Sequence, residues 1–352
     1  MYKRALLGLL ICLMALCPAF SGGSKEAAGK TSAGSGKEPE WIHNPYSKYD
    51  EAANVAVVGR GSTREFAEKD SLGRLVAIFG QSIEVDDKVS VSYQEAVKTG
   101  VTASWSESTA INTSIATSAG LDSLVGAETG ETWDDGNGTF FTVAFLNKAK
   151  AAQQYSEMIK SNQAMIDNLV DMSASEKNTL EGLARYQLAA TIADVNISYG
   201  NLLSFIGRPV QGLKKGDEYR LEAVNITKAI PVLLKVDNDK SGRIQGAFAK
   251  AFSDLGFRSG GSDSRYVLDA NIVTSPVNLA GNPNLFTRIE IKANLIDTNL
   301  SSVLLPYDFN IREGHTSQSE ADNRAYMSAE RKINQEYSVL LGDYLSRLLP
   351  NK

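Results

Sequence analysis

The stretch from Asp237 to Ile244 is the part of the sequence whose residue types and spacing best match metal chemistry. Its residues, DNDKSGRI, fit the first eight positions of a calcium-binding loop, with Asp237, Asp239 and Ser241 as candidate ligands. The twelfth position, which needs a bidentate glutamate, is Phe248, and a strand pattern rather than a helix precedes the loop. We therefore predict a strand-to-helix turn whose Asp and Ser side chains cap the helix, with no metal site. A calcium-dependent binding module stays open as an alternative.

Acid–base chemistry would have to use His43 or His315, the only two histidines. They lie in separate parts of the chain, and no G-x-S-x-G or H-E-x-x-H motif accompanies either. His315 precedes a helix start, where polar residues are common, so we predict no catalytic residue. Carboxylates such as Glu128 and Glu131 keep a periplasmic hydrolase open as an alternative, because two carboxylates suffice for glycoside hydrolysis.

Two glycine-containing stretches resemble parts of phosphate-binding loops, and neither has the full pattern. Residues 24–31, SKEAAGKT, lack one glycine of a P-loop and follow no strand. Gly59-Arg60-Gly61 does follow a strand, but Arg64 occupies the third glycine position of the dinucleotide fingerprint. The sequence therefore predicts no cofactor and identifies no small-molecule ligand.

Composition excludes further classes of function. The 352 residues include 36 Lys+Arg and 41 Asp+Glu, a net charge of −5, so the chain lacks the basic balance of a nucleic-acid-binding protein. Two cysteines and two histidines cannot build a zinc site, an iron–sulfur cluster or a disulfide scaffold. A hydrophobic content of 43% is typical of folded globular chains.

The N-terminus has the pattern of an export signal. Lys3 and Arg4 precede twelve mostly apolar residues, 5–16, a run too short to span a bilayer. Ala19 and Ser21 place small residues at the −3 and −1 positions, which favours cleavage after Ser21 and a soluble exported chain. Met14-Ala15-Leu16-Cys17 is the competing lipobox, with Cys17 as the lipid attachment site and a large Leu16 where a small residue is usual. Both forms stay open.

Periodicity and composition divide the chain into six segments and predict an α+β fold class. Two small sheet-plus-helix units, each ordered strand–helix–strands–helix, are expected at either side of a long helical hairpin. The predicted segments are a signal peptide (1–21), a flexible linker (22–40), a first α+β domain (41–147), a helical hairpin (148–206), a linker (207–219) and a second α+β domain (220–352).

In the first domain, a capping box from Ser62 to Glu65 predicts a helix start, and tandem Gly and Asn predict a tight hairpin turn. Residues 101–120 fit strand and helix equally well. The predicted elements are a strand at 53–58, a helix to about 79, a strand at 88–94, and a hairpin of 124–133 and 139–146 with its turn at 135–138.

The later segments have stronger patterns. Residues 148–206 are helical, with a break near 172–174 and a second capping box from Ser173 to Glu176, so the two helices should be antiparallel. Clean alternation predicts strands with one buried face, and Pro306 predicts an edge strand. The predicted elements of the second domain are a strand at 230–236, a helix at 242–255, strands around 268–272, 289–295 and 305–311, and a helix from Ser317 with alanines 321, 325 and 329 against the sheet.

Three short motifs resemble the Lpp-twenty family of bacterial outer-membrane lipoproteins, which is related to the N-terminal domain of the flagellar assembly protein T. They are EWIHNP at 40–45, VAVVGRGST at 55–63 and FTVAF at 141–145, followed by an Ala/Lys helix. The resemblance covers about residues 40–165. It implies an envelope protein without catalysis, often lipid-anchored and sometimes part of a flagellar or surface assembly.

Together these observations predict an exported, non-enzymatic cell-envelope protein that acts as a scaffold or interaction module. The expected location is the periplasm or the outer membrane, as a lipoprotein. The expected partners are other envelope proteins or a second copy of the chain. Contact with a membrane is expected only through an N-terminal lipid, and no contact with nucleic acid is expected.

Overall fold

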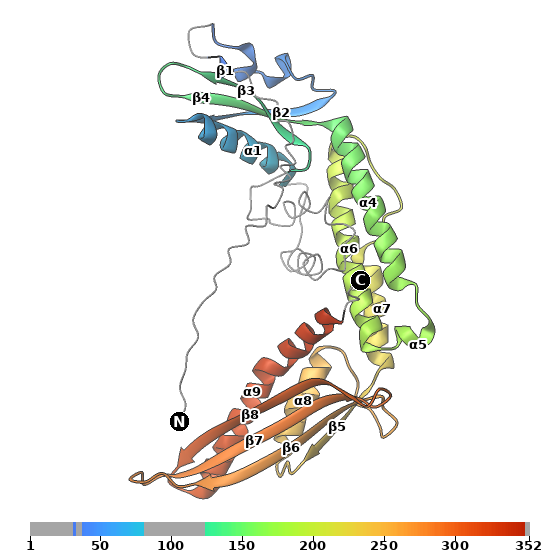
Figure 1. The fold of residues 1–352 in the computed structure, drawn as a ribbon, viewed down its shortest axis with the longest axis vertical. Helices are drawn as coiled ribbons and strands as arrows, with labels where there is room; N and C mark the ends of the chain where they lie inside the picture. The colour runs from blue at the N-terminus through green and yellow to red at the C-terminus, as the bar shows by residue number, and fades with distance from the viewer. Residues whose placement is uncertain (1–30, 33–36, 81–123, 349–352) are drawn as a thin grey trace, which may run out of the picture.

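The computed structural model describes residues 31–32, 37–80 and 124–348 (Figure 1). In this part of the chain the fold is mixed α+β, with two sheets ordered β1-β3-β4-β2 and β5-β6-β7-β8. The predicted fold class, two sheet-plus-helix units joined by long helices, is confirmed. The expectations for residues 1–21, for the strand at 88–94 and for 101–120 lie outside the described residues.

The first unit is a sheet covered on both faces. On one face lies α1; on the other, the first of two short 3₁₀ helices brings Trp41 and Ile42 against Val143. The predicted hairpin is confirmed, with Asp135 accepting backbone hydrogen bonds from Asn137 (2.8 Å) and Thr139 (2.9 Å) in its turn. The elements are β1 (Thr31–Ser32), η1 (Glu40–Ile42), η2 (Pro45–Ser47), β2 (Asn54–Gly61), α1 (Arg64–Gly80), β3 (Ala127–Asp134) and β4 (Phe140–Asn147).

The start of α1 differs from its prediction by one residue. Thr63, not Ser62, is the capping residue, because its Oγ1 accepts a hydrogen bond from the amide of Phe66 (3.3 Å). The helix then passes very close to β2: a Cβ atom added at Gly59 would lie 2.1 Å from the backbone nitrogen of Ser71. Glycine at this position is therefore required by helix–strand packing.

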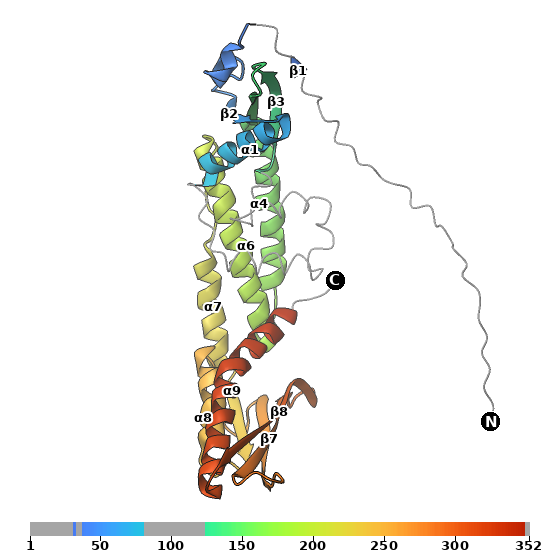
Figure 2. The same ribbon diagram turned by 90° about the vertical axis from the view of Figure 1, so that its left-hand side faces the viewer.

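Three helices, α4, α6 and α7, lie together and form what we call the stalk (Figure 2). The predicted break and capping box at Ser173 are confirmed, whereas α7 was not predicted and its first turn occupies the end of the expected linker at 207–219. No helix in the described part of the chain is both long and apolar enough to cross a membrane. The elements are α4 (Lys148–Val170), α5 (Ala174–Lys177), α6 (Leu180–Phe205) and α7 (Gly216–Ala229).

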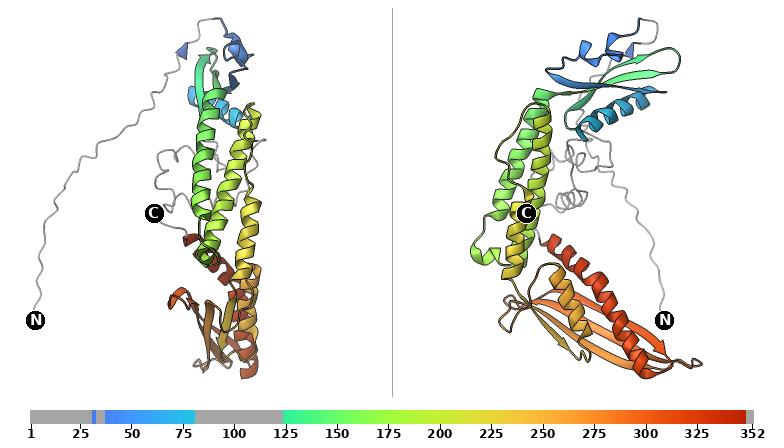
Figure 3. Two further views of the ribbon diagram at one scale, coloured as in Figure 1. Left: turned by 90° about the vertical axis from the view of Figure 1, so that its right-hand side faces the viewer. Right: turned by 180° about the vertical axis from the view of Figure 1, so that it is seen from behind.

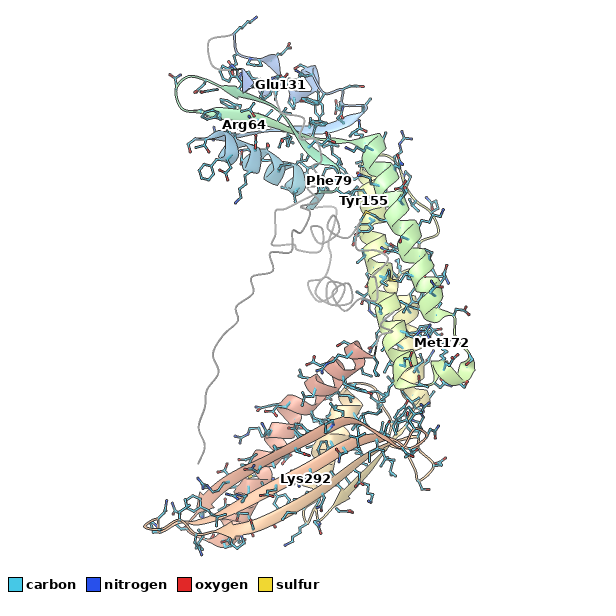
Figure 4. All side chains as sticks on the ribbon, in the orientation of Figure 1. Arg64, Phe79, Glu131, Tyr155, Met172 and Lys292 are labelled. Carbon is cyan, nitrogen blue, oxygen red and sulfur yellow. The ribbon has the colours of Figure 1, made fainter. Side chains whose placement is uncertain are left out.

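The two ends of α6 belong to two different hydrophobic cores. Near its C-terminal end, Tyr199 and Leu202 join Tyr155 of α4 and Phe79 of α1, and the labelled Phe79 and Tyr155 lie close together in Figure 4. At its N-terminal end, Leu183 is buried with the side chains of the second unit. The stalk therefore continues into both cores and links them through packed side chains.

The second unit is a four-stranded sheet with α8 and α9 on one face (Figure 3). The predicted alternation is confirmed, Pro306 lies on the edge strand β8, and Ala321, Ala325 and Ala329 are fully buried. Small side chains let α9 approach the sheet closely. The elements are β5 (Val232–Asp237), α8 (Arg243–Asp254), β6 (Tyr266–Val277), β7 (Leu285–Asp297), β8 (Ser302–His315) and α9 (Gln318–Arg347).

Candidate functional site

The candidate metal ligands lie at the predicted strand-to-helix turn between β5 and α8. Asp237 ends β5 and faces Lys235 at 3.8 Å. Both oxygens of the Asp239 carboxylate accept backbone hydrogen bonds, one from Gln245 (2.9 Å) and one from Ser241 (3.4 Å). Within the described residues there is no group of three or more His, Cys, Asp and Glu side chains that could hold a metal ion. The turn thus uses its carboxylates for capping and charge pairing.

We expect Asp239→Ala to lower the free energy of unfolding by about 1 kcal/mol, because α8 loses the acceptor for the Gln245 amide. Chemical denaturation measures this loss. Isothermal titration with calcium is expected to give no heat of binding in the natural chain or in Asp237→Ala. Saturable binding that Asp237→Ala abolishes would instead support the calcium module.

The two histidines are placed far from each other in the fold. The His43 Nε2 atom lies 3.0 Å from Glu38 on the surface beside η1. At the end of β8, the His315 Nδ1 atom accepts a hydrogen bond from the Ser317 amide (3.3 Å), next to the start of α9. Each imidazole therefore has a local partner at a chain turn, in a different unit.

The carboxylates of β3 each pair with a lysine. Glu131, labelled in Figure 4, lies 2.5 Å from Lys48, and Glu128 pairs with Lys150. All four side chains are more than one-third exposed. A glycosidase-type pair needs two carboxylates facing one substrate bond. Glu128 and Glu131 instead each form a separate ion pair with a lysine on the surface.

A cluster of hydrogen-bonded residues lies where the stalk meets the second unit. We call this cluster the joint; it consists of Leu180, Arg265, Tyr266 and Asp297. Arg265 binds Asp297 through two nitrogens, Nε at 3.0 Å and Nη2 at 2.7 Å. The Asp297 side chain is only 3% exposed. Next along β6, the Tyr266 hydroxyl accepts a hydrogen bond from the Leu180 amide (3.1 Å) at the N-terminus of α6. The joint therefore ties the stalk directly to the sheet.

Burial and hydrogen bonding act in opposite directions on Asp297. Burial alone would raise the pKa of this carboxyl, but hydrogen bonds from Arg265 and from the amides of Asn299 and Leu300 outweigh it, and the pKa is lowered. Burial raises the pKa of the Tyr266 phenol. At neutral pH the joint therefore holds a charged carboxylate against a guanidinium, beside a neutral phenol.

A cavity of about 430 Å³ opens beside the joint. Its wall combines charged side chains of both signs, such as Glu181 and Arg185, with apolar ones, such as Leu304 and Leu348. Within its described lining no hydroxyl or thiol stands next to an imidazole, the arrangement of a nucleophile with its base. The cavity is lined by residues of the stalk, such as Leu180, and of the second unit, such as Tyr344 and Leu348.

Sequence reasoning missed the joint completely. Arg265 lies just before a strand pattern and Asp297 just after another, where polar residues are ordinary. The one usable signal was the hairpin register, because pairing β6 with β7 places Tyr266 opposite Asp297. That register is not visible until the two strands are aligned in space.

The fold and the joint define an α+β protein whose two units are linked by a helical stalk, and comparisons with known proteins add little to this description. No protein-family model and no curated protein matches the chain. Similar solved structures include a putative lipoprotein from Caulobacter crescentus, which is 15% identical in sequence and has a TM-score of 0.25. The match covers 32% of this chain and 90% of the lipoprotein. The secreted protein HP1454 of Helicobacter pylori has 11% identity, covers 80% and 97%, and has a TM-score of 0.38. Lipoprotein GNA1162 of Neisseria meningitidis has 13% identity, covers 30% and 95%, and has a TM-score of 0.19. At such scores these likenesses carry no argument about the function of this chain.

Proposed function

We propose that this chain is an exported envelope protein without catalysis, which holds two interaction units at a set distance from each other. The observation that carries the proposal is the stalk, whose long helix α6 is built into both cores. At 1.5 Å per residue, the 23 residues of α4 and the 26 of α6 correspond to about 35 and 39 Å. Such helices exceed what is needed to cover a small sheet.

The stalk has the packing of a rigid spacer. Most of the inner face of α6 is buried, and a buried hydrogen bond (2.8 Å) joins Asn162 of α4 to Asn196 of α6. Asp194 of α6 also pairs with Arg220 of α7 and accepts the Gly216 amide (3.0 Å). Because these contacts fix the helices side by side, the two units would not move freely as domains on a flexible linker do.

Export is proposed from the N-terminal residues. The signal pattern suits a chain that is exported from the cytosol, and the Gly/Ser/Ala-rich residues 22–40 suit a flexible tether between the folded part and a leader or lipid anchor. Two mature forms follow: cleavage after Ser21 gives a periplasmic chain, and acylation of Cys17 gives an outer-membrane lipoprotein. Proposed partners are other envelope proteins or a second copy of the chain.

Intact mass of the mature protein, expressed full-length in a bacterium, tests export and the anchor together. A mass corresponding to an N-terminal Gly22 indicates the soluble form, and a diacylated Cys17 indicates the anchored form. In the anchored case Cys17→Ala should move the protein from the membrane to the periplasmic fraction, while Cys12→Ala should not. Retention of the complete leader in the cytosol would contradict the proposal.

Crosslinking of intact envelopes tests the scaffold role. The full-length chain should be recovered in crosslinked species that are absent when the same chain, deleted for residues 2–21, is kept in the cytosol. Recovery of the exported chain as an uncrosslinked monomer only would contradict a scaffold.

A further inference from the structure

The outer edge of β8 is the long open sheet edge in the described part of the molecule (Figure 1). The other edge strands are shorter, with two residues in β1, eight in β2 and six in β5, and β5 and β2 carry local cover. At β5, Val232 exchanges backbone hydrogen bonds with Arg258 and Gly260, and at β2 the Arg60 amide donates to the Asp70 carboxylate. The 14 residues of β8 have a neighbouring strand on one side only. Unpaired edges are templates for another strand, and proteins usually cover or disrupt them.

The solvent face of β8 carries one acidic and one basic residue, Asp308 and Arg312, and their spacing restricts which strand could pair with it. On the solvent face, Asp308, Asn310 and Arg312 are all exposed and follow one another at two-residue spacing. In the register with β7, Arg312 lies directly opposite Arg288. Like charges opposite each other destabilise a sheet. Within the described residues neither Asp308 nor Arg312 forms an ion pair; Asp308 lies opposite Lys292 of β7, and Arg312 lies over the Phe286 ring at 5.8 Å.

We propose that a second copy of this chain pairs with β8 in antiparallel orientation, about a two-fold axis at Asn310. In that register Asp308 lies opposite Arg312 of the second copy, and Arg312 lies opposite its Asp308. Each Arg312 thus gains a carboxylate directly opposite it, where its own sheet places Arg288. A two-fold contact is self-complementary, so both ion pairs form at once.

Neighbouring registers lack this match. An axis at Asp308 would place two carboxylates opposite each other, and an axis at Arg312 would place two guanidinium groups opposite each other. An axis at Phe309 would place Asp308 opposite Asn310, and an axis at Ile311 would place Arg312 opposite Asn310. In both registers neither charge lies opposite a residue of opposite charge. The register at Asn310 is the one that pairs opposite charges directly, and charge pairing of this kind selects register in sheets.

The buried face of the sheet agrees with the same register. There Phe309 would lie opposite Ile311 of the second copy, and both side chains are only partly buried in the single chain. The Phe309 ring packs beside Tyr307 (5.2 Å) and lies under Lys332 of α9 (5.7 Å), so part of its cover is a long, flexible lysine side chain. Pairing would bury more of both side chains. Pro306, which cannot donate to a ladder, falls opposite Gly314 at the margin of the paired segment.

A charge exchange tests the proposal on the exported, purified chain. We expect the natural protein to sediment with twice the mass of one chain. Asp308→Arg and Arg312→Asp should each weaken the dimer about 100-fold or more, because two ion pairs become two like-charge contacts. The double variant with both changes restores opposite charges and should recover the dimer. Asp269→Arg, on the same solvent face but on β6, is the matched control and should leave the mass unchanged.

A cysteine crosslink gives a second readout that does not depend on affinity. Residues facing each other across antiparallel strands have Cα atoms about 4.5 or 5.5 Å apart, within reach of a disulfide. Both natural cysteines, Cys12 and Cys17, lie in the leader. Asn310→Cys should therefore form a covalent dimer under mild oxidation, and Asn271→Cys, exposed on β6, should not. A monomeric natural chain without the Asn310→Cys crosslink would overturn the pairing, and would leave the envelope role untouched.

Discussion

Replacing Arg265 with alanine is expected to lower the free energy of unfolding by about 3 kcal/mol or more. Asp297, with 3% of its side chain exposed, would remain buried without its bidentate partner. Removing one member of a buried ion pair typically costs about 3–5 kcal/mol. Because Arg265 is itself 30% exposed, we expect the lower end of that range. Urea unfolding followed by circular dichroism measures the loss.

The effect of this substitution should depend on pH in a defined direction. In the natural chain the pKa of Asp297 is lowered, so its charge stabilises the fold above the ordinary carboxyl pKa of about 3.9, and this stability is lost as the pH falls through the lowered value. Without Arg265, only the amides of Asn299 and Leu300 oppose the effect of burial, so the pKa of Asp297 should rise relative to the natural chain and the variant should lose most stability at neutral pH. The difference between the two proteins should therefore be largest near pH 7 and shrink toward about pH 3.

Arg243→Ala is the matched control for charge removal. Arg243 pairs with Glu330 at 3.4 Å, and both side chains are well exposed, at 40% and 38%. Exposed ion pairs contribute about 0–1 kcal/mol. Equal losses for Arg265→Ala and Arg243→Ala, or a difference that is independent of pH, would contradict the structural role of the joint.

Gly59→Ala is expected to destabilise the first unit by about 3 kcal/mol or more. The added Cβ atom would lie 2.1 Å from the Ser71 nitrogen and 2.7 Å from the Ala67 carbonyl oxygen, both in the backbone of α1. Backbone cannot rotate away as a side chain can, so α1 would have to move off the sheet. Tryptophan fluorescence in urea reports this unit, because Trp41 and Trp133 pack on its sheet.

Gly246→Ala is the control for Gly59→Ala and is expected to raise stability in the same urea unfolding experiment. Gly246 lies inside α8, and an added Cβ atom meets no other atom within 4 Å. Alanine should therefore stabilise the chain by about 0.5–1 kcal/mol, through lower chain entropy in the unfolded state and better helix propensity. Loss of stability at Gly246 comparable to that at Gly59 would show that the close helix–strand approach is not the cause.

The glycines of the Gly59-Arg60-Gly61 motif are required by the structure, but for packing and not for binding a ligand. Its position after a strand and before a helix is the context of a dinucleotide fingerprint. In the structure, both glycines instead face the backbone of α1, since a Cβ atom on Gly61 would lie 2.5 Å from the Ala67 nitrogen. Close packing and close approach of a phosphate both require glycine, so the sequence cannot separate them.

Two errors in the prediction, the first residue of α1 and the missed helix α7, have their causes in tertiary packing. Ser62 and Thr63 are both good capping residues, and the choice of Thr63 depends on where the close contact with β2 places the first turn of α1. The helix α7 has buried residues at the spacing of one helix face, Tyr219, Ala223 and Ile226, but charged residues surround them. Its stability comes from packing on α6, which no single segment reveals.

The residue pattern by itself determined the fold class, the hairpin, the helix break at Ser173 and the buried faces of β6, β7 and β8. These features follow from short-range periodicity and capping, because side chains repeat at 2.0 or 3.6 residues and caps act within one turn. Only the tertiary structure decided the joint, where Leu180 meets Tyr266 across 86 residues and Arg265 meets Asp297 across 32. Such contacts form between complete elements, and a partner that distant leaves no periodic mark on either segment.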